Sequence, residues 1–249
     1  MSNDSRADPI KPKLLALLRE ARAEHQAWLD HLTETERAAS GTPDHWSPKD
    51  TVAHLTSWRR ISLDRVEAVL RGEQPRGDEA VQPHNEATFA RERPRPWDDV
   101  LVESDSVFDA QFAAVEALSE AQLSETSYPW LDGFPFWASV AGTFEHTLDH
   151  LTDYYRERGD WSRVEQTLDR QTQGLLSLDS SPTMRAYVSY SQGGFWATVE
   201  RPDRALPLLR EAFTLDPKLV EDARENASLA ALRALPAFQS LLSTPSASE

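Results

Sequence analysis

Apolar side chains recur at helical spacing along most of the chain, and this pattern limits the fold more than any other feature. Near the start, Leu14, Leu18, Ala21, His25 and Trp28 recur every three or four positions, which places them on one side of a helix. Only 9 of the 249 residues are glycine, and runs of alternating β-branched residues are missing. The pattern predicts an all-α protein.

Four long helices are predicted, at residues 12–38, 48–71, 97–118 and 135–158. The second has the clearest beginning. Ser47 can accept a hydrogen bond from an N–H of the first turn, Pro48 suits the first helical position, and Asp50 adds negative charge there. A crossover loop at 73–83 and a short helix at 85–92 separate the second long helix from the third. Four long helices with one long crossover predict an antiparallel four-helix bundle.

The composition shifts to Ser, Gln and Thr near residue 160, and shorter helices are expected beyond it. We expect them at 183–199, 202–214, 218–224 and 228–243. The predicted organisation is therefore a bundle over residues 1–160, a linker over 161–181 with room for one helix, and a helical extension over 182–249. Residues 1–12 and 244–249 are expected to be polar tails.

Charge and composition exclude several classes of function. The chain has 41 acidic and 26 basic residues and a net charge of −15, which repels nucleic-acid phosphates and acidic membrane surfaces. It has no cysteine, which excludes disulfides, thiolate ligands and cysteine nucleophiles. No signal-peptide pattern and no run of about 18 apolar residues is found. These features predict a cytoplasmic protein with no nucleic-acid or membrane partner, and no dinucleotide or phosphate-loop motif indicates a nucleotide cofactor.

Three histidines are candidate metal ligands. His146 and His150 are four positions apart, so both rings project from one face of a helix and can reach one ion, and His54 on a neighbouring helix can complete the set. On a helical wheel of residues 135–158, the pair lies nearly opposite the stripe of apolar side chains. The two rings therefore either line a polar cavity or face solvent. His54 lies at the edge of the apolar stripe of the helix at 48–71. The alternative to metal binding is that His54 has a structural role and forms a hydrogen bond with a neighbour. The spacing leaves both interpretations open.

Acidic and aromatic residues near these histidines have two interpretations as well. Glu145 and Asp149 lie around the helix from the pair, where they could support metal ligands through hydrogen bonds or form a solvated acidic face. Four aromatic residues could wall a pocket or simply pack in the core. They are Trp58, Tyr128, Trp130 and Trp137.

Three segments resemble the DinB superfamily of four-helix bundles, and most closely its ClbS/DfsB-like branch. Residues 46–58, WSPKDTVAHLTSW, resemble the signature of the second helix. Residues 85–100 are similar to the third region of that branch, and residues 142–150, GTFEHTLDH, resemble its last helix. The three segments occur in the expected order, and the resemblance covers residues 12–160.

The resemblance implies a cavity that often holds Zn or Ni on three histidines, which map to His54, His146 and His150. The chain departs from the usual pattern after the pair, where residues 151–155 replace a further His and a Gly-Gln. ClbS-like members also need not use a metal. The superfamily includes thiol-dependent transferases and isomerases and a hydrolase that confers self-resistance to a genotoxin. The resemblance therefore implies a metal-dependent hydrolase or transferase that acts on a small electrophilic compound, and the alternative is a non-catalytic helical scaffold or stress protein.

The C-terminal extension resembles a single tetratricopeptide repeat. Residues 182–217 contain two predicted helices, small residues where the helices would cross, and a closing proline, and residues 218–242 resemble the capping tail of such repeats. Repeat proteins generally need about three repeats for independent stability. We therefore expect the extension to pack on the bundle or on a second copy, and it could bind a protein partner or form a homodimer.

Overall fold

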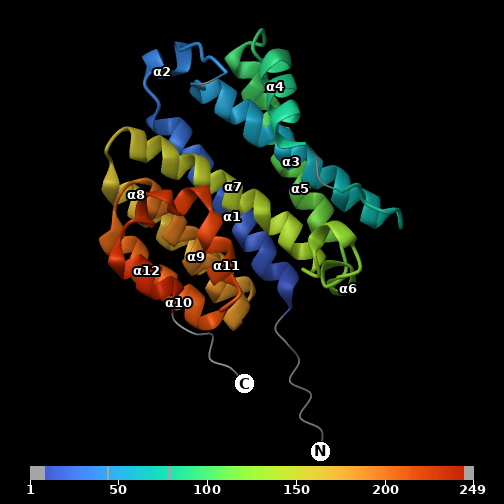
Figure 1. The fold of residues 1–249 in the computed structure, drawn as a ribbon. Helices are drawn as coiled ribbons and strands as arrows, with labels where there is room; N and C mark the ends of the chain where they lie inside the picture. Colours follow the sequence, from blue (N-terminus) through green and yellow to red (C-terminus); the bar gives the residue numbers. More distant parts are fainter. Residues whose placement is uncertain (1–8, 44, 78–79, 244–249) are drawn as a thin grey trace, which may run out of the picture. The chain divides into compact units, whose positions relative to one another are not determined.

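The computed structural model describes residues 9–43, 45–77 and 80–243, and these residues form helices and no strand (Figure 1). The predicted all-α class is confirmed. The chain divides into two compact units, Met1–Thr167 and Leu168–Glu249. Most of the two expected polar tails, residues 1–8 and 244–249, lies outside the described residues.

The first unit is built on four long helices, and this confirms the predicted four-helix bundle. α3 packs along α5, and α1 packs along α7. The long helices are α1 (Ile10–His31), α3 (Pro48–Leu70), α5 (Trp97–Ala117) and α7 (Phe136–Glu157). The short elements between them are α2 (Glu34–Ala38), α4 (Val81–Glu92), α6 (Glu120–Leu123) and the 3-10 helix η1 (Pro129–Leu131).

The predicted antiparallel arrangement was wrong for α3 and α5, which run parallel, because their contacts advance in the same direction along both helices. The guanidinium of Arg59 lies over the ring of Phe108. Three residues farther along each helix, Gln111 Nε2 donates a hydrogen bond of 3.2 Å to Ser62 Oγ. Parallel neighbours require the chain to cross back between them. The segment that contains α4 is this crossover, as the prolines and glycines around residues 73–83 predict.

The core of the bundle explains the helical periodicity. Along α7, Phe136, Val140, Phe144, Leu148 and Leu151 recur every three or four residues, and each is at most 1% exposed. Each such side chain stabilises the fold by roughly 1.5–3 kcal/mol relative to an exposed one. These residues form one buried side of α7, so polar residues can occupy its other side.

Two predicted helices are each interrupted. The predicted helix 12–38 was wrong as one element, because the backbone is extended at Leu32 and Thr33. Thr33 starts the new helix α2 with a capping box, in which its side chain accepts from Glu36 N and its backbone N–H donates to the Glu36 carboxylate. The predicted helix 228–243 divides in the same way into the 3-10 helix η2 (Ala227–Leu232) and α12 (Pro236–Leu242), since the residue before a proline favours an extended backbone.

The second unit consists of short helices, and two of them approach closely. A Cβ atom added at Gly193 of α9 would lie 2.8 Å from the side chain of Leu209 of α10. A glycine is therefore required where these two helices cross. α8 begins within the first unit and ends within the second. The elements are α8 (Trp161–Leu178), α9 (Pro182–Thr198), α10 (Pro202–Leu215) and α11 (Leu219–Glu225), followed by η2 and α12. The predicted boundaries at residues 160 and 181 stay predictions.

No helix in the described ranges combines the length and the apolarity needed to cross a bilayer.

One charge is buried inside the bundle without an opposite charge. The side chain of Arg59 is 2% exposed, and its guanidinium carbon lies 3.4 Å from the centre of the Phe108 ring. Nη1 of Arg59 has no hydrogen-bond partner, and no carboxylate pairs with this side chain among the described residues. Burial, with a smaller effect of the positive Arg22, lowers the pKa of Arg59 to about 9. The group is therefore still charged at pH 7.

We expect Arg59→Met to stabilise the protein by about 1–4 kcal/mol at pH 7. Replacing a buried charge with an apolar side chain of similar volume removes a desolvation penalty, and the charge has no paired carboxylate to lose. Urea unfolding at pH 7 measures the change. Arg60→Met is the matched control, because Arg60 is exposed and pairs with Glu103, and its removal should change stability by less than about 1 kcal/mol. A clear loss of stability in Arg59→Met would show that the guanidinium has a favourable partner.

Candidate metal centre

The start of α3 fixes the position of His54. Ser47 N donates a hydrogen bond of 2.8 Å to Asp50 Oδ2, and Asp50 N donates to Ser47 Oγ at 3.3 Å, so both halves of a capping box are present. The preceding loop packs closely on this cap. A Cβ atom at Gly41 would lie 2.0 Å from Asp50 Oδ2 and 2.5 Å from Ser47 N. His54 follows two helical turns after the cap and is 5% exposed.

α7 supplies the other two histidines. His146 and His150 lie on the side of the helix that is opposite to the apolar stripe, and both side chains are partly buried. They line a cavity between α3, α4 and α7, together with His54. Of the two alternatives that the helical wheel leaves open, the rings therefore line a cavity and do not face bulk solvent.

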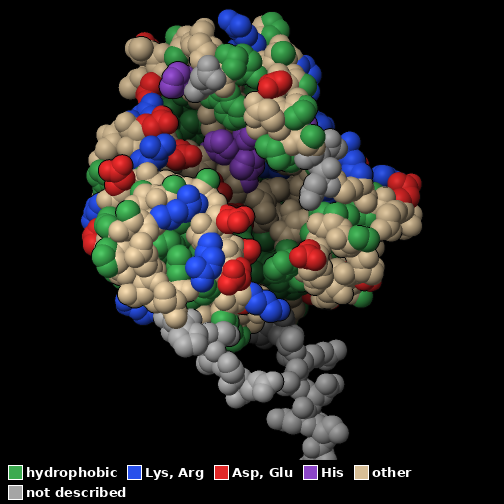
Figure 2. All heavy atoms as spheres, in the orientation of Figure 1, with side chains coloured by type: hydrophobic (Ala, Val, Ile, Leu, Met, Phe, Trp, Pro, Cys, Tyr) green, Lys and Arg blue, Asp and Glu red, His purple; other side chains and the backbone are tan. Residues whose placement is uncertain are grey.

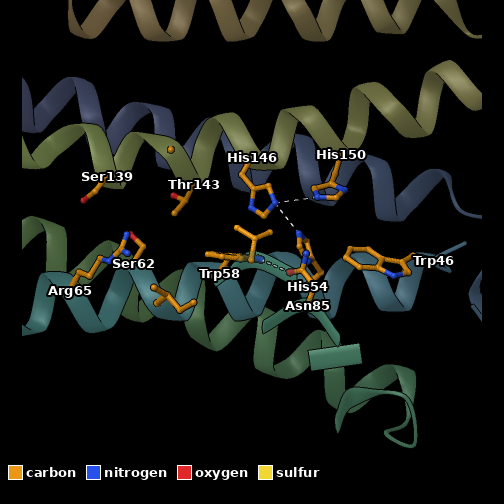
Figure 3. A pocket seen from close by; sticks show the side chains of 13 residues that line it. Trp46, His54, Trp58, Ser62, Arg65, Asn85, Ser139, Thr143, His146 and His150 are labelled. Carbon is orange, nitrogen blue, oxygen red and sulfur yellow. Dashed lines mark hydrogen bonds between the residues drawn. The ribbon is translucent and has the colours of Figure 1, made fainter. Parts of the chain in front are cut away.

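The three imidazoles converge on one point. His146 Nε2 lies 2.9 Å from His54 Nε2 and 3.1 Å from His150 Nε2, and one ring nitrogen of each histidine lies within 4.8 Å of the others (Figure 3). For comparison, two nitrogens that are each bound to a tetrahedral zinc ion at 2.0–2.1 Å lie about 3.3 Å apart. Two of the three nitrogen pairs are thus within a few tenths of an ångström of that separation, and all three nitrogens lie within 4.8 Å of one another.

Burial keeps these rings neutral. Burial, together with smaller effects of the nearby His150 and His146, lowers the pKa of His54 to about 2. Burial also lowers the pKa of His146 to about 3, with smaller effects of His150 and Arg59. The pKa of His150 is lowered by burial, although Asp153 acts in the opposite direction. At pH 7 all three rings can therefore offer a nitrogen lone pair, which is the form that binds a metal ion.

The donor set fits a divalent cation better than it fits hydrogen bonding. In a neutral imidazole, Nε2 carries either one proton or one lone pair. His146 Nε2 has two close nitrogen neighbours, so it can make only one of the two contacts as a good hydrogen bond. A cation at the point of convergence would satisfy every nitrogen at once. His54 Nδ1 is buried without a hydrogen-bond partner among the described residues, so this ring lacks the outer hydrogen bond that usually orients a metal-binding histidine.

The cavity beside the histidines has a volume of about 470 Å³. Figure 2 shows histidine side chains within a hollow of the surface. Two tryptophans flank the rings. The Trp46 ring centre lies 4.5 Å from that of His54, and the Trp58 ring centre lies 6.2 Å from that of His146. The other lining residues are Ile61, Ser62, Arg65, Val81, Asn85, Ser139, Gly142 and Thr143.

A sequence model of the DinB superfamily matches residues 7–157, which is more than half of the chain. The chain belongs to the DinB superfamily. The match covers the whole four-helix bundle of the first unit, including the helices that carry the three histidines. The comparisons with curated proteins and with solved structures give no match.

Other predicted site residues of this DinB protein have mixed outcomes. Trp58 lines the cavity, but Tyr128, Trp130 and Trp137 are not among its lining residues. Trp137 is 7% exposed and packs in the core. Trp130 instead lies beneath the guanidinium of Arg65.

The two acidic residues beside the histidines do not belong to the group of converging side chains. The cluster of potential ligands contains histidines only, and neither Glu145 nor Asp149 lines the cavity. Asp149 is exposed and Glu145 is partly exposed.

Sequence reasoning missed Trp46 and the residues of α4 that line or support the cavity. Trp58 Nε1 donates a hydrogen bond of 3.0 Å to Asn85 Oδ1, and Ser57 Oγ lies 2.7 Å from His84 Nε2. These contacts join positions that are 27 residues apart, so no local spacing indicates them. The only local signal for Trp46 is its place directly before the helix cap at Ser47.

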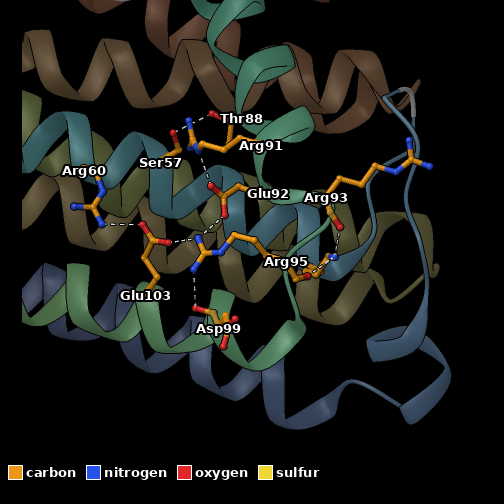
Figure 4. Close-up of polar contacts among 10 residues, drawn as sticks. Ser57, Arg60, Thr88, Arg91, Glu92, Arg93, Arg95, Asp99 and Glu103 are labelled. Atoms are coloured by element: carbon orange, nitrogen blue, oxygen red, sulfur yellow. Dashed lines mark hydrogen bonds and ion pairs between the residues drawn. The ribbon is translucent and has the colours of Figure 1, made fainter.

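A polar network holds the crossover segment of this DinB bundle against the long helices (Figure 4). The carboxylate of Glu92 is largely buried and accepts hydrogen bonds of 2.6 Å from both Arg91 and Arg95. Arg95 also pairs with Glu103 of α5. Lys49 of α3 donates to the carbonyl oxygen of Arg95 at 2.9 Å. These contacts fix the end of α4, the helix that supplies Val81 and Asn85 to the cavity.

Proposed function

We propose that the protein is a metal-dependent enzyme of the ClbS/DfsB-like branch of the DinB superfamily, and that it acts as a hydrolase or transferase on a small electrophilic compound. A detoxification or self-resistance role fits such a substrate. The observation that carries the proposal is the convergence of three neutral imidazole nitrogens at the wall of a cavity.

In this proposal His54, His146 and His150 hold one divalent ion, Zn or Ni. When bound, such an ion acts as a Lewis acid that polarises an electrophilic group. The three imidazoles suit several divalent metals, so the donor set alone does not select between them.

The protein's own residues bind and orient the substrate. The indole of Trp58 is held by its hydrogen bond to Asn85, so it is a fixed apolar wall beside the histidines. The hydroxyls of Ser139 and Thr143 donate to carbonyl oxygens of α7. Thr143 Oγ1 also accepts a hydrogen bond of 3.3 Å from Gln111 Nε2, so each hydroxyl keeps at least one oxygen lone pair for a further contact. The cavity therefore offers apolar contact near the histidines and weak acceptors farther along α7.

Metal content and turnover test this proposal. The full chain, purified without an affinity tag and incubated with Zn or Ni, should retain about one metal ion per chain. It should also turn over p-nitrophenyl acetate or 1-chloro-2,4-dinitrobenzene, the latter with an added thiol, and a chelator should remove this activity. The alternative function is a helical scaffold whose C-terminal helices bind a partner or a second copy. Protein that stays metal-free and inactive but dimerises in light scattering would favour the scaffold.

We also propose that α9 and α10 form a tetratricopeptide-like helix pair. The close crossing at Gly193 supports this, because such pairs have small residues where the two helices meet. The pair is the surface that the scaffold alternative would use.

A further inference from the structure

One glycine opens the cavity beside the histidines. Gly142 lies within α7, one helical turn before His146, and it lines the cavity. A Cβ atom added at Gly142 would have no atom of the rest of the protein within 4 Å. The space beside this glycine is therefore empty of protein, and any larger side chain would extend into it.

Local structure gives no reason for a glycine at this position. The backbone at Gly142 is helical and does not have a positive φ, unlike Gly72, Gly133 and Gly159. Glycine is the poorest helix former after proline, so it weakens α7 here. It is also not required by a close neighbour, in contrast to Gly193. What the glycine provides is volume within the cavity.

Two of the side chains that line this cavity are apolar and fixed. Trp58 and Ile61 of α3 line the same cavity, and Ile61 is 4% exposed. The indole of Trp58 is held on one side by the hydrogen bond from its Nε1 to Asn85 and on another by the ring of His84, whose centre is 4.7 Å away. A rigid indole, an isoleucine and bare helix backbone together make an apolar space that suits a flat ring.

The position of this space relative to the histidines defines the ligand further. An α-helix rises 1.5 Å per residue, so Gly142 and His146 are separated by about 6 Å along α7. We propose that Gly142, Trp58 and Ile61 form a subsite for an aromatic ring, and that the substrate is an aryl compound whose reacting atom lies one or two bonds from that ring. This inference rests on the proposed function, because it takes the histidines as the reacting end of the cavity.

Hydroxamates of graded structure test the subsite, because the hydroxamate group binds the metal and the remainder probes the cavity. We expect the Zn-loaded protein to bind phenylacetohydroxamate about 10- to 100-fold more tightly than acetohydroxamate in calorimetry, as burial of a phenyl ring predicts. Cyclohexylacetohydroxamate, which has a thicker ring, should bind at least about 5-fold more weakly than the phenyl compound. Equal binding of the two ring compounds would overturn the aromatic class.

Gly142→Leu should remove the affinity gained from the phenyl ring and leave the metal content and the binding of acetohydroxamate unchanged. Ala87→Leu is the matched control, because it adds the same bulk to an exposed position of α4 that does not line the cavity. Gly142→Ala should reduce the affinity gained from the phenyl ring only in part. This variant still tests the subsite if Gly142→Leu does not fold. A full phenyl gain in a folded Gly142→Leu protein would refute the subsite.

A probe without a metal-binding group separates this inference from the proposed function. If the protein holds no metal, or acetohydroxamate does not bind to the loaded protein, the proposed function fails. Phenylacetamide then tests the subsite alone, by saturation-transfer NMR on the same variants. Ring contacts that are present in the wild type and in Ala87→Leu but lost in Gly142→Leu would support the subsite, and their absence in the wild type would overturn it.

Discussion

His146→Ala should reduce the affinity for Zn or Ni by at least about 100-fold and leave the purified protein without stoichiometric metal. His146 is the central member of the cluster, since its Nε2 lies within 3.1 Å of the Nε2 atoms of both His54 and His150. Its loss leaves two imidazoles from different helices with no third donor. Because changes to supporting residues alone cost 10- to 100-fold in affinity, loss of a direct ligand should cost at least as much. Metal analysis after dialysis, and titration with a competing chelator, measure the effect.

His84→Ala is the matched control for this experiment. His84 also lies beside the cavity, where its Nε2 is 2.7 Å from Ser57 Oγ and its ring is against Trp58, but it does not belong to the cluster of three. This variant should keep the metal. If His146→Ala and His84→Ala bind metal equally well, the three-histidine centre is wrong.

The metal-free protein should lose several kcal/mol of stability between pH 7 and pH 5. Burial lowers the pKa of His54 to about 2 and that of His146 and His25 to about 3, whereas each returns to about 6.5 on unfolding. The folded state therefore stays neutral at these positions while the unfolded state takes up protons. Below about pH 6.5, each such histidine costs roughly 1.4 kcal/mol of stability per pH unit, until the pH reaches its folded pKa. Three of them give about 4–6 kcal/mol at pH 5.

Urea unfolding at pH values from 7.5 to 4.5 measures how the free energy of unfolding changes with pH. His25 is useful because it is buried between α1 and α5, with its ring against Trp28 and Phe108, and lies outside the metal cluster. His25→Gln should therefore reduce the loss of unfolding free energy per pH unit by the contribution of one histidine. A stability that stays constant from pH 7 to pH 5 would contradict the burial of these rings.

The bundle could be predicted from the sequence because its helices are marked locally. Ser47, Pro48 and Asp50 define the start of α3, and the buried stripe of α7 defines both that helix and the opposite position of His146 and His150. The break after α1 was missed, because the apolar pattern continues to Leu32, directly before the cap that Thr33 and Glu36 form. The capping interaction, and not the apolar periodicity, determines where the helix ends at these residues.

Only part of the candidate site could be predicted from the sequence, namely the three histidines that the structure brings together. Helical spacing places His146 and His150 on one face, but it does not say which side chains stand opposite. The contacts of Trp58 with Asn85 and His84 depend on how α4 crosses the bundle, and nothing in the short segment around each residue determines that path. For the same reason the sequence left open whether Trp130 lines the pocket or packs elsewhere, and in the structure it packs against Arg65.

The three converging nitrogens come from distant parts of the sequence, since His54 and His146 are 92 positions apart. An ion shared by them would act as a cross-link that closes a long loop of the chain. The entropy lost by an unfolded chain on such closure grows with the length of the loop, so this link would restrain the bundle as a whole as well as the site. Removal of the ion by a chelator would then weaken the contact between α3 and α7. A fall in resistance to proteases after chelation would show that the metal had been bound, without any knowledge of the substrate.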